Sequence, residues 1–284
     1  MIIEGHANAK INLTLRITGK DELGYHKLQS VFVFPIDVFD TLLIDTEKEF
    51  DESSGYILGV DSVDNSVRKA GKILMNTFQR KLPYIEIEKR IPIGSGLGGG
   101  SSDAARFIEM VFNIWDVSIK DRIQSIKFFN PLGSDTIIFL YQYLQYMDTN
   151  ALFIDGTGID GIVRPISIRE LRHCYIVVVN DGTFLSTECV YDNFTGPFQP
   201  TLDITMFDFN YLKDYHNSLQ KSSISLVPQI QNVLLSIEVT NPYFFGVSGS
   251  GSSCFGLYDS LERAKGALKS LSIYGYRFLK MSRI

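Results

Sequence analysis

The segment from Pro92 to Ala105 reads PIGSGLGGGSSDAA and is the part of the sequence best suited to chemistry. Its five glycines between Gly94 and Gly100 allow positive φ angles and let a ligand approach the backbone without Cβ atoms in the way. Ser101, Ser102 and Asp103 follow as capping residues, and a helix that begins there offers unpaired N–H groups and the positive end of its dipole. These features predict an anion site that suits phosphates, to which a serine hydroxyl could add a contact with phosphate or Mg²⁺.

Three other interpretations of this loop are weaker. Gly94, Gly96 and Gly99 formally satisfy GxGxxG, but that dinucleotide fingerprint belongs in the first turn of a βαβ unit, and this loop follows antiparallel-looking strands. A Walker loop needs Lys and then Ser or Thr after its glycines, whereas Ser101-Ser102-Asp103 stands here. A turn without a ligand is the plainest alternative, and so many glycines directly before a capped helix argue against it.

The elements that would position this loop follow from hydrophobic spacing. From Lys10 to Ile17 apolar and polar residues alternate, which predicts a half-buried strand with Lys10 and Asn12 on one polar face. Helical spacing after Asn65 predicts a helix that this residue caps. Further strands are expected at 30–36, 41–45, 84–88, 175–180, 244–247, 254–258 and 276–279, and further helices from 101 onward and at 119–128, 207–220, 228–238 and 261–271. Their irregular alternation favours an α+β architecture over a strictly parallel sheet.

A second glycine-rich segment, GVSGSGSSCFGLY, spans Gly246 to Tyr258 between two of the predicted strands. By itself it predicts a hairpin turn. Beside the first loop it could close over the other side of a nucleotide. Cys254 is expected to be a packed residue of the following strand, because nothing near it in sequence would lower the pKa of its thiol.

Composition excludes several classes of protein. The chain has 284 residues, 45% hydrophobic and 21% charged, which is enough for one large domain or two smaller ones sharing a cleft. A net charge of −5 without any Lys/Arg run argues against nucleic acid as a partner. Three cysteines without metal-ligand spacing predict neither a metal site nor a disulfide framework, and they favour the cytoplasm. No stretch resembles a signal peptide or a membrane span.

Several motifs in order along the chain resemble those of the GHMP kinases, the family of galactokinase, homoserine kinase, mevalonate kinase and phosphomevalonate kinase. PIGSGLGGGSSDAA resembles the second signature of the family, and SGSGSSCFGLY resembles the third. AKINLTLRITGKDELGYHKLQSVF and NPLGSDTIIF resemble, more narrowly, the members that phosphorylate the cytidyl diphosphate of methylerythritol. Together with VDNSVRKA, these segments span nearly the whole chain.

The resemblance implies an α+β, two-domain GHMP kinase fold: an N-terminal ATP-binding domain over 1–158, a C-terminal ferredoxin-like domain over 159–284, and substrate in the cleft between them. It implies transfer of the γ-phosphate of ATP, with Mg²⁺, to the 2-hydroxyl of the methylerythritol unit by a monomer or weak homodimer. Lys10 and Asp135 match the catalytic lysine and aspartate of the family. Asp135, expected in a loop before an apolar run, could accept the hydroxyl proton, and Lys10 could keep it ionised and offset charge on the phosphoryl group.

The resemblance also implies two sets of binding residues. On the substrate side, Tyr25 and His26 match residues that hold the cytosine, and Tyr191 aligns with an aromatic that stacks on it, an interaction worth about 1–3 kcal/mol per base. Also expected on the substrate side are Asn12, Phe32, Gly249 and Gly251. The ATP set comprises Asn65 near the adenine and Pro92, Gly94, Ser95, Gly96, Leu97, Gly98, Gly99, Gly100, Ser101 and Ser102 along the loop.

This sequence departs from the family pattern in three places. Asn8 and Ile137 replace prolines that are usual in the first motif and after the aspartate, and residues 197–223 match no segment of the family. Another GHMP kinase, acting on homoserine or mevalonate, is the nearest alternative, although its pocket would have no use for Tyr25 and His26. A nicotinamide-dependent oxidoreductase is a more distant alternative, which titration with NADH against ATP tests. A non-catalytic nucleotide-binding module is another, and the presence of both Lys10 and Asp135 argues against it.

Overall fold

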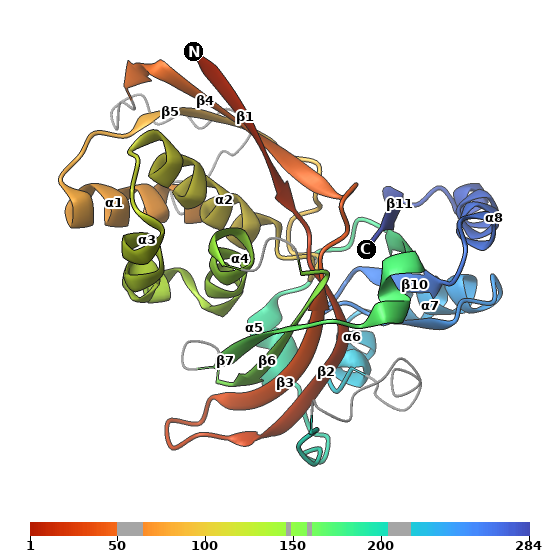
Figure 1. Cartoon of the computed structure of the whole chain (residues 1–284). Helices are drawn as coiled ribbons and strands as arrows, with labels where there is room; N and C mark the ends of the chain where they lie inside the picture. Colours follow the sequence, from red (N-terminus) through yellow and green to blue (C-terminus); the bar gives the residue numbers. More distant parts are fainter. Residues whose placement is uncertain (50–64, 146–148, 158–160, 204–216) are drawn as a thin grey trace. The chain divides into compact units, whose positions relative to one another are not determined.

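The computed structural model of the chain describes residues 1–49, 65–145, 149–157, 161–203 and 217–284 (Figure 1). The chain divides into two compact units that interleave along the sequence. The first unit takes Met1–Ala9, Phe39–Ile91 and Gly98–Asp148, and the second takes Lys10–Val38, Pro92–Leu97 and Thr149–Ile284. Residues 10–38 and 92–97 thus group with the C-terminal half, and the division at 158/159 stays a prediction about the sequence domains.

The first unit packs helices against one antiparallel sheet. Its elements are β1 (Ile2–Asn8), β4 (Phe39–Glu49), α1 (Ser66–Phe78), β5 (Pro83–Glu88), α2 (Gly99–Ile114), α3 (Ile119–Ser125), the 3-10 helix η1 (Ile126–Leu132) and α4 (Ser134–Leu144). The strand order is β1-β4-β5, and α2 contacts β1, β4, α1 and α4 (Figure 1). Because α2 has neighbours on several sides, it is apolar around most of its circumference, and Phe107, Ile108 and Phe112 are buried.

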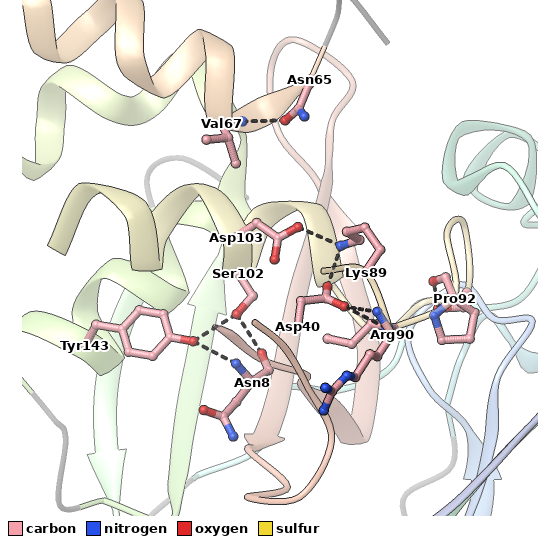
Figure 2. Close-up of polar contacts among 12 residues, drawn as sticks. Asn8, Asp40, Asn65, Val67, Lys89, Arg90, Pro92, Ser102, Asp103 and Tyr143 are labelled. Atoms are coloured by element: carbon pink, nitrogen blue, oxygen red, sulfur yellow. Dashed lines mark hydrogen bonds and ion pairs between the residues drawn. The ribbon is translucent and has the colours of Figure 1, made fainter. Parts of the chain in front are cut away.

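The predicted start of α1 is confirmed. Asn65 has extended backbone angles, and its Oδ1 accepts a hydrogen bond from the N–H of Val67 at 2.7 Å (Figure 2). Val67, Ala70 and Leu74 are buried at the expected helical spacing.

The predicted start of α2 is wrong by two residues. The helix begins at Gly99, and its N-cap is Gly98, with φ 72° and no side-chain cap. Ser101, Ser102 and Asp103 therefore lie inside the first turns and do not cap them. Glycine at 98 is required by the left-handed backbone, which disfavours residues that carry a Cβ.

The second unit contains two four-stranded sheets. Its elements are β2 (Ile11–Lys20), β3 (His26–Val33), β6 (Ala151–Gly156), β7 (Ile162–Ile166), η2 (Arg169–His173), β8 (Tyr175–Asn180), α5 (Thr187–Asp192), α6 (Gln220–Leu226), α7 (Gln229–Glu238), β9 (Phe244–Val247), β10 (Cys254–Tyr258), α8 (Leu261–Leu271), η5 (Ser272–Tyr274) and β11 (Phe278–Arg283). The strand orders are β2-β3-β6-β7 and β11-β8-β10-β9, and α7 and α8 pack on the latter sheet. Every strand pair within the described ranges is antiparallel, which confirms the α+β class.

The strand predicted from Lys10 to Ile17 is confirmed as β2, but the prediction that one face is exposed is wrong. Asn12, Thr14 and Arg16 are all buried. Each of these side chains finds a partner inside the unit, since buried polar groups are costly otherwise. Asn12 donates to Ser30 Oγ at 2.9 Å, Thr14 Oγ1 accepts from a β3 N–H at 3.1 Å, and Arg16 donates to the carbonyl of Pro200 at 2.5 Å.

The free edge of β2 is covered by part of the segment that matched nothing in the family. The N–H of Gln199 donates to Ile17 O at 2.8 Å, and the N–H of Ser218 donates to Leu15 O at 2.7 Å. These bonds satisfy edge carbonyls that would otherwise invite another strand. The helix expected at 207–220 lies largely in 204–216, outside the described residues, and α6 begins at Gln220.

The hairpin predicted from the second glycine-rich segment is confirmed. Strands β9 and β10 pair antiparallel, with residues 248–253 as their connection. Cys254 is buried in β10, and burial raises the pKa of its thiol far above the usual value, as expected for a packed residue. The other differences are local: the helix at 119–128 changes to η1 after Ser125, and the last strand begins at Phe278. No helix in the described part of the chain is long and apolar enough to cross a bilayer.

Candidate active site

The first half of the glycine loop and the hairpin loop lie backbone to backbone in the second unit. The N–H of Ser253 donates to Ser95 O at 2.9 Å, and Ser248 Oγ donates to Gly96 O at 3.2 Å. Gly96 has φ +76°, and a Cβ added to it would lie 2.2 Å from Ser248 O. Glycine at this position therefore permits both the left-handed backbone and the close approach of the two loops.

Buried polar side chains outside the hairpin loop hydrogen-bond to the backbone and the serine hydroxyls of the loop. Asn217 Nδ2 donates to Val247 O at 2.8 Å and to Gly249 O at 2.6 Å. Ser223 Oγ donates to Ser250 O at 2.9 Å, and Asn180 Nδ2 donates to the hydroxyl oxygens of Ser252 and Ser253 at 3.0 Å. With its carbonyls and hydroxyls bound in this way, the loop is a rigid partner for the first glycine loop.

Lys10 lies beside both loops within the second unit. Its N–H donates to Leu97 O at 2.9 Å, and its Nζ donates to Asn12 Oδ1 at 2.6 Å. The ammonium lies 5.1 Å from the centroid of the Phe32 ring. A Cβ added to Gly249 would lie 3.1 Å from Lys10 Nζ and from Asn12 Oδ1. The structure thus brings together four residues that the sequence predicted separately, Lys10, Asn12, Phe32 and Gly249.

An aromatic group gathers around His26 at the start of β3. The His26 ring lies 5.4 Å from the Tyr191 ring, centroid to centroid, and 5.7 Å from the Phe194 ring, which meets it edge-on. Burial lowers the pKa of His26, Lys20 lowers it further, and Asp192 opposes the shift. The imidazole is therefore neutral at pH 7, with one nitrogen that donates and one that accepts. Tyr25, next along the chain, is 68% exposed.

Ser102 lies in a closed set of three hydrogen bonds within the first unit (Figure 2). Its Oγ donates to Asn8 O at 2.6 Å, and the N–H of Asn8 donates to Tyr143 Oη at 3.0 Å. Since the Ser102 hydrogen is used on Asn8, the 2.9 Å contact between the two hydroxyls is a donation from Tyr143 to Ser102. The Asn8 N–H that closes this set is one that the usual proline at this position would lack.

Asp103, the next residue of α2, belongs to a buried charge cluster (Figure 2). Lys89 Nζ lies 2.6 Å from Asp103 Oδ2 and makes a still shorter contact with Asp40 Oδ2. Burial alone would lower the pKa of Lys89, but the two carboxylates outweigh it and raise the pKa, so the side chain stays an ammonium ion. Burial raises the pKa of Asp103 to about 7; Lys89 opposes this rise, and Asp40 adds to it.

Asp135 lies in the first turn of α4, not in a loop. The N-cap of this helix is Gly133, and the helix dipole favours a carboxylate at this position. Ile137, in place of the usual proline, supplies an N–H that donates to Gly133 O at 3.4 Å, which lets the helix begin this early. Asp135 belongs to the first unit and Lys10 to the second, so their pairing stays a prediction.

Comparison with known proteins agrees with this arrangement of motifs. The GHMP kinases N terminal domain matches residues 65–142, and the GHMP kinases C terminal domain matches residues 204–277. The 4-diphosphocytidyl-2-C-methyl-D-erythritol kinase of Ruegeria pomeroyi is 32% identical over 272 residues, which cover 92% of this chain and 90% of that protein. The protein of the same name from Chlorobium phaeobacteroides is 30% identical, covering 95% of this chain and 91% of its own.

The chain belongs to the 4-diphosphocytidyl-2-C-methyl-D-erythritol kinase family of GHMP kinases. A crystal structure of 4-(cytidine 5'-diphospho)-2C-methyl-D-erythritol kinase is similar over 99% of this chain, with a TM-score of 0.78 and 25% identity. The homoserine kinase of Cytophaga hutchinsonii, at 15% identity and a TM-score of 0.63, shares the fold. The expected family, fold and phosphotransferase class are therefore confirmed.

The predicted binding residues of this GHMP kinase differ in how available they are to a ligand. Ser102 is fully buried and its hydrogen is committed to Asn8, whereas Ser101 is partly exposed at the same helix start. Gly251 lies within the hairpin loop, and a Cβ added to it would meet apolar side chains, Val247 among them. These positions suit support of the loops, and direct contact with ATP or substrate stays a prediction for them.

Sequence reasoning missed Phe194, Tyr143, Asp40 and Lys89. Phe194 stands three residues after Tyr191, just beyond the end of α5 at Asp192, and this closeness in sequence was the available signal for a second ring in the group. The other three become visible only when β4, β5, α2 and α4 are packed together, because each bonds to a residue far away in sequence.

The raised pKa of Asp103 predicts a pH dependence of stability. Its pKa is about 7 in the folded chain, against 3.8 for an ordinary aspartate. The folded chain therefore keeps a proton that the unfolded chain releases, so the stability from this group is complete below 3.8 and is lost as the pH rises through 7. Asp103→Asn cannot titrate, and we expect the unfolding free energy of the wild type to fall, relative to this variant, by more than about 1 kcal/mol between about pH 5 and about pH 8.

Urea unfolding of both proteins across this pH range measures the difference. The control is Asp121→Asn, which changes an exposed aspartate in the first turn of α3 and should show no such trend. A constant difference between wild type and Asp103→Asn would contradict the assignment.

Proposed function

We propose that this kinase transfers the γ-phosphoryl group of ATP to the 2-hydroxyl of 4-diphosphocytidyl-2-C-methyl-D-erythritol. The observation that carries the substrate assignment is the group formed by His26, Tyr191 and Phe194, in the same unit as Lys10. A pyrimidine stacks on aromatic rings, and a neutral imidazole offers both a donor and an acceptor to the edge of the base. Substrates as small as homoserine or mevalonate have no ring for such a group.

The catalytic roles follow from the chemistry of phosphoryl transfer, which needs positioning and charge neutralisation more than covalent steps. We assign Asp135 as the base that accepts the proton of the 2-hydroxyl, and Lys10 as the cation that offsets negative charge on the transferring group. Asn12 holds the Lys10 ammonium through its Oδ1 at 2.6 Å. Asn65, Ser101 and the glycines of the loop are assigned to ATP.

Mg²⁺ is part of the proposal as the companion of the ATP phosphates. Within the described ranges no group of three His, Cys, Asp or Glu side chains could hold a metal ion. An ion that accompanies nucleotide phosphates is bound mainly by phosphate oxygens and water, with few protein ligands. We also propose that the enzyme works in the cytoplasm, a proposal supported by its three unpaired cysteines, Cys174, Cys189 and Cys254.

Release of ADP in the presence of Mg²⁺, measured with the cytidyl substrate, homoserine or mevalonate, tests the function. Of these three acceptors, we expect only the cytidyl substrate to be phosphorylated. Tyr191→Leu should raise the KM for this substrate by about tenfold or more while leaving the KM for ATP unchanged, because stacking contributes about 1–3 kcal/mol. Tyr276→Leu, elsewhere in the second unit, is the control. Turnover with homoserine or mevalonate instead would refute the assignment.

A further inference from the structure

The buried cluster of Asp40, Lys89 and Asp103 lies where the chain enters and leaves the glycine loop (Figure 2). Lys89 directly follows β5, three residues before Pro92, and Asp103 lies in α2 just after the loop. The side chains are 15% exposed for Lys89, 0% for Asp40 and 4% for Asp103. One ammonium group thus joins the two ends of the loop within the first unit.

Asp40 extends this connection to the backbone on the entry side. Its Oδ1 accepts the N–H of Ile91 at 2.8 Å and that of Arg90 at 2.5 Å, while its Oδ2 contacts Lys89. One carboxylate of β4 therefore fixes the direction of the chain immediately before the loop.

Gly99 allows the start of α2, on the exit side of the loop, to lie close to the residues on the entry side. A Cβ added to Gly99 would lie 3.0 Å from Ile91 Cγ2 and 3.3 Å from Lys89 Nζ. Without that atom, the first residue of α2 packs directly on the last residues before the loop.

The charges show that this cluster is not arranged for maximal stability. It buries two carboxyl groups against one ammonium, and Asp103 Oδ1 has no hydrogen-bond partner among the described residues. Buried ion pairs often contribute little net stability, because desolvation offsets their attraction, and replacement by apolar groups is frequently neutral. In some proteins the use of such a pair is to specify one geometry.

We propose that Lys89, held between Asp40 and Asp103, is a positioning residue that sets the entry and exit of the phosphate loop and thereby the affinity for nucleotide. The proposal rests on the proposed function to the extent that the loop binds ATP. Two of the three Lys89 hydrogens are used on the carboxylates, and the role assigned to the residue is to position the loop.

Calorimetric titration with ADP tests this proposal without requiring turnover. We expect Lys89→Met to raise the Kd for ADP by about tenfold or more, since misplacement of phosphate-binding N–H groups weakens each of their bonds. Asp103→Ala leaves the pair of Lys89 and Asp40 intact and should also raise the Kd for ADP. This variant tests the proposal if Lys89→Met does not fold. Lys89→Arg, which keeps the charge, should recover part of the affinity.

The matched control is Arg106→Met, which breaks the 2.9 Å ion pair with Glu109 further along the same helix. It should leave the Kd for ADP within about threefold of the wild-type value.

In kinetic assays the Lys89 and Asp103 variants should raise the KM for ATP and leave the KM for the cytidyl substrate unchanged. Unchanged ADP affinity in the folded variants, or equal weakening in Arg106→Met, would overturn the proposal. Wild-type protein that binds ADP but does not phosphorylate the cytidyl substrate would instead refute the function alone.

Discussion

Replacement of Asp135 by asparagine is expected to lower kcat by about 10²–10⁴-fold, the usual contribution of a general base. The amide keeps the size of the side chain but cannot accept the proton of the substrate hydroxyl. The KM for ATP should change little, because the residue is assigned to the acceptor and not to the nucleotide. Steady-state ADP release with both substrates varied in turn measures the two parameters separately.

The same substitution also removes a negative charge from the first turn of α4, where the helix dipole favours it. Asp121→Asn makes the equivalent change in the first turn of α3 and controls for that loss, which is about 0.3–1 kcal/mol of stability. Lys10→Ala should likewise lower kcat with ATP still bound. An Asp135→Asn enzyme that retains turnover near that of the wild type would show that another group takes the proton.

Substitution of alanine for Gly96 is expected to reduce kcat/KM for ATP by about 100-fold or more, because a displacement of about 1 Å near a reacting group is this costly. The added Cβ would lie 2.2 Å from Ser248 O and 2.9 Å from Gly251 N, and these backbone atoms are fixed by the hydrogen bonds of the hairpin loop. The two glycine loops would have to separate.

Gly275→Ala provides the matched control for this prediction. Gly275 has φ +66°, close to the +76° of Gly96, but a Cβ added there meets no atom within 4 Å. Both variants should lose about 1 kcal/mol of stability from backbone strain, and Gly96→Ala should lose more. Urea unfolding and steady-state kinetics distinguish the two effects. Equal kinetics in the two variants would mean that contact between the loops does not matter for nucleotide binding.

The local features of this chain follow from its sequence because neighbouring residues carry them. The Asn65 cap bonds to a residue two positions away, the helix after the glycine loop shows its periodicity within the helix itself, and the hairpin of β9 and β10 needs only a short connection. The start of α2 was misplaced because serine and aspartate ordinarily cap helices. Here a left-handed glycine begins the helix, and the polar residues bond to other elements.

The pairings that complete the candidate site were decided by the tertiary structure. One set joins Asp40 of β4, Lys89 just after β5 and Asp103 of α2. The other joins Asn8 of β1, Ser102 of α2 and Tyr143 of α4. Alternation in β2 predicted an exposed polar face, yet Asn12 and Arg16 are buried because partners from β3 and the segment after Phe198 reach them.

The sequence by itself determined the glycine loop, its helix and the family motifs, since these depend on residue type and short spacing. Only the tertiary structure decided which polar residues hold that loop and which are available to a ligand, because hydrogen bonds and ion pairs form between groups that folding brings within about 3 Å. Ser102 and Asp103 illustrate the difference. The pattern marks both as capping or phosphate-binding residues, whereas packing commits them to partners up to 94 residues away.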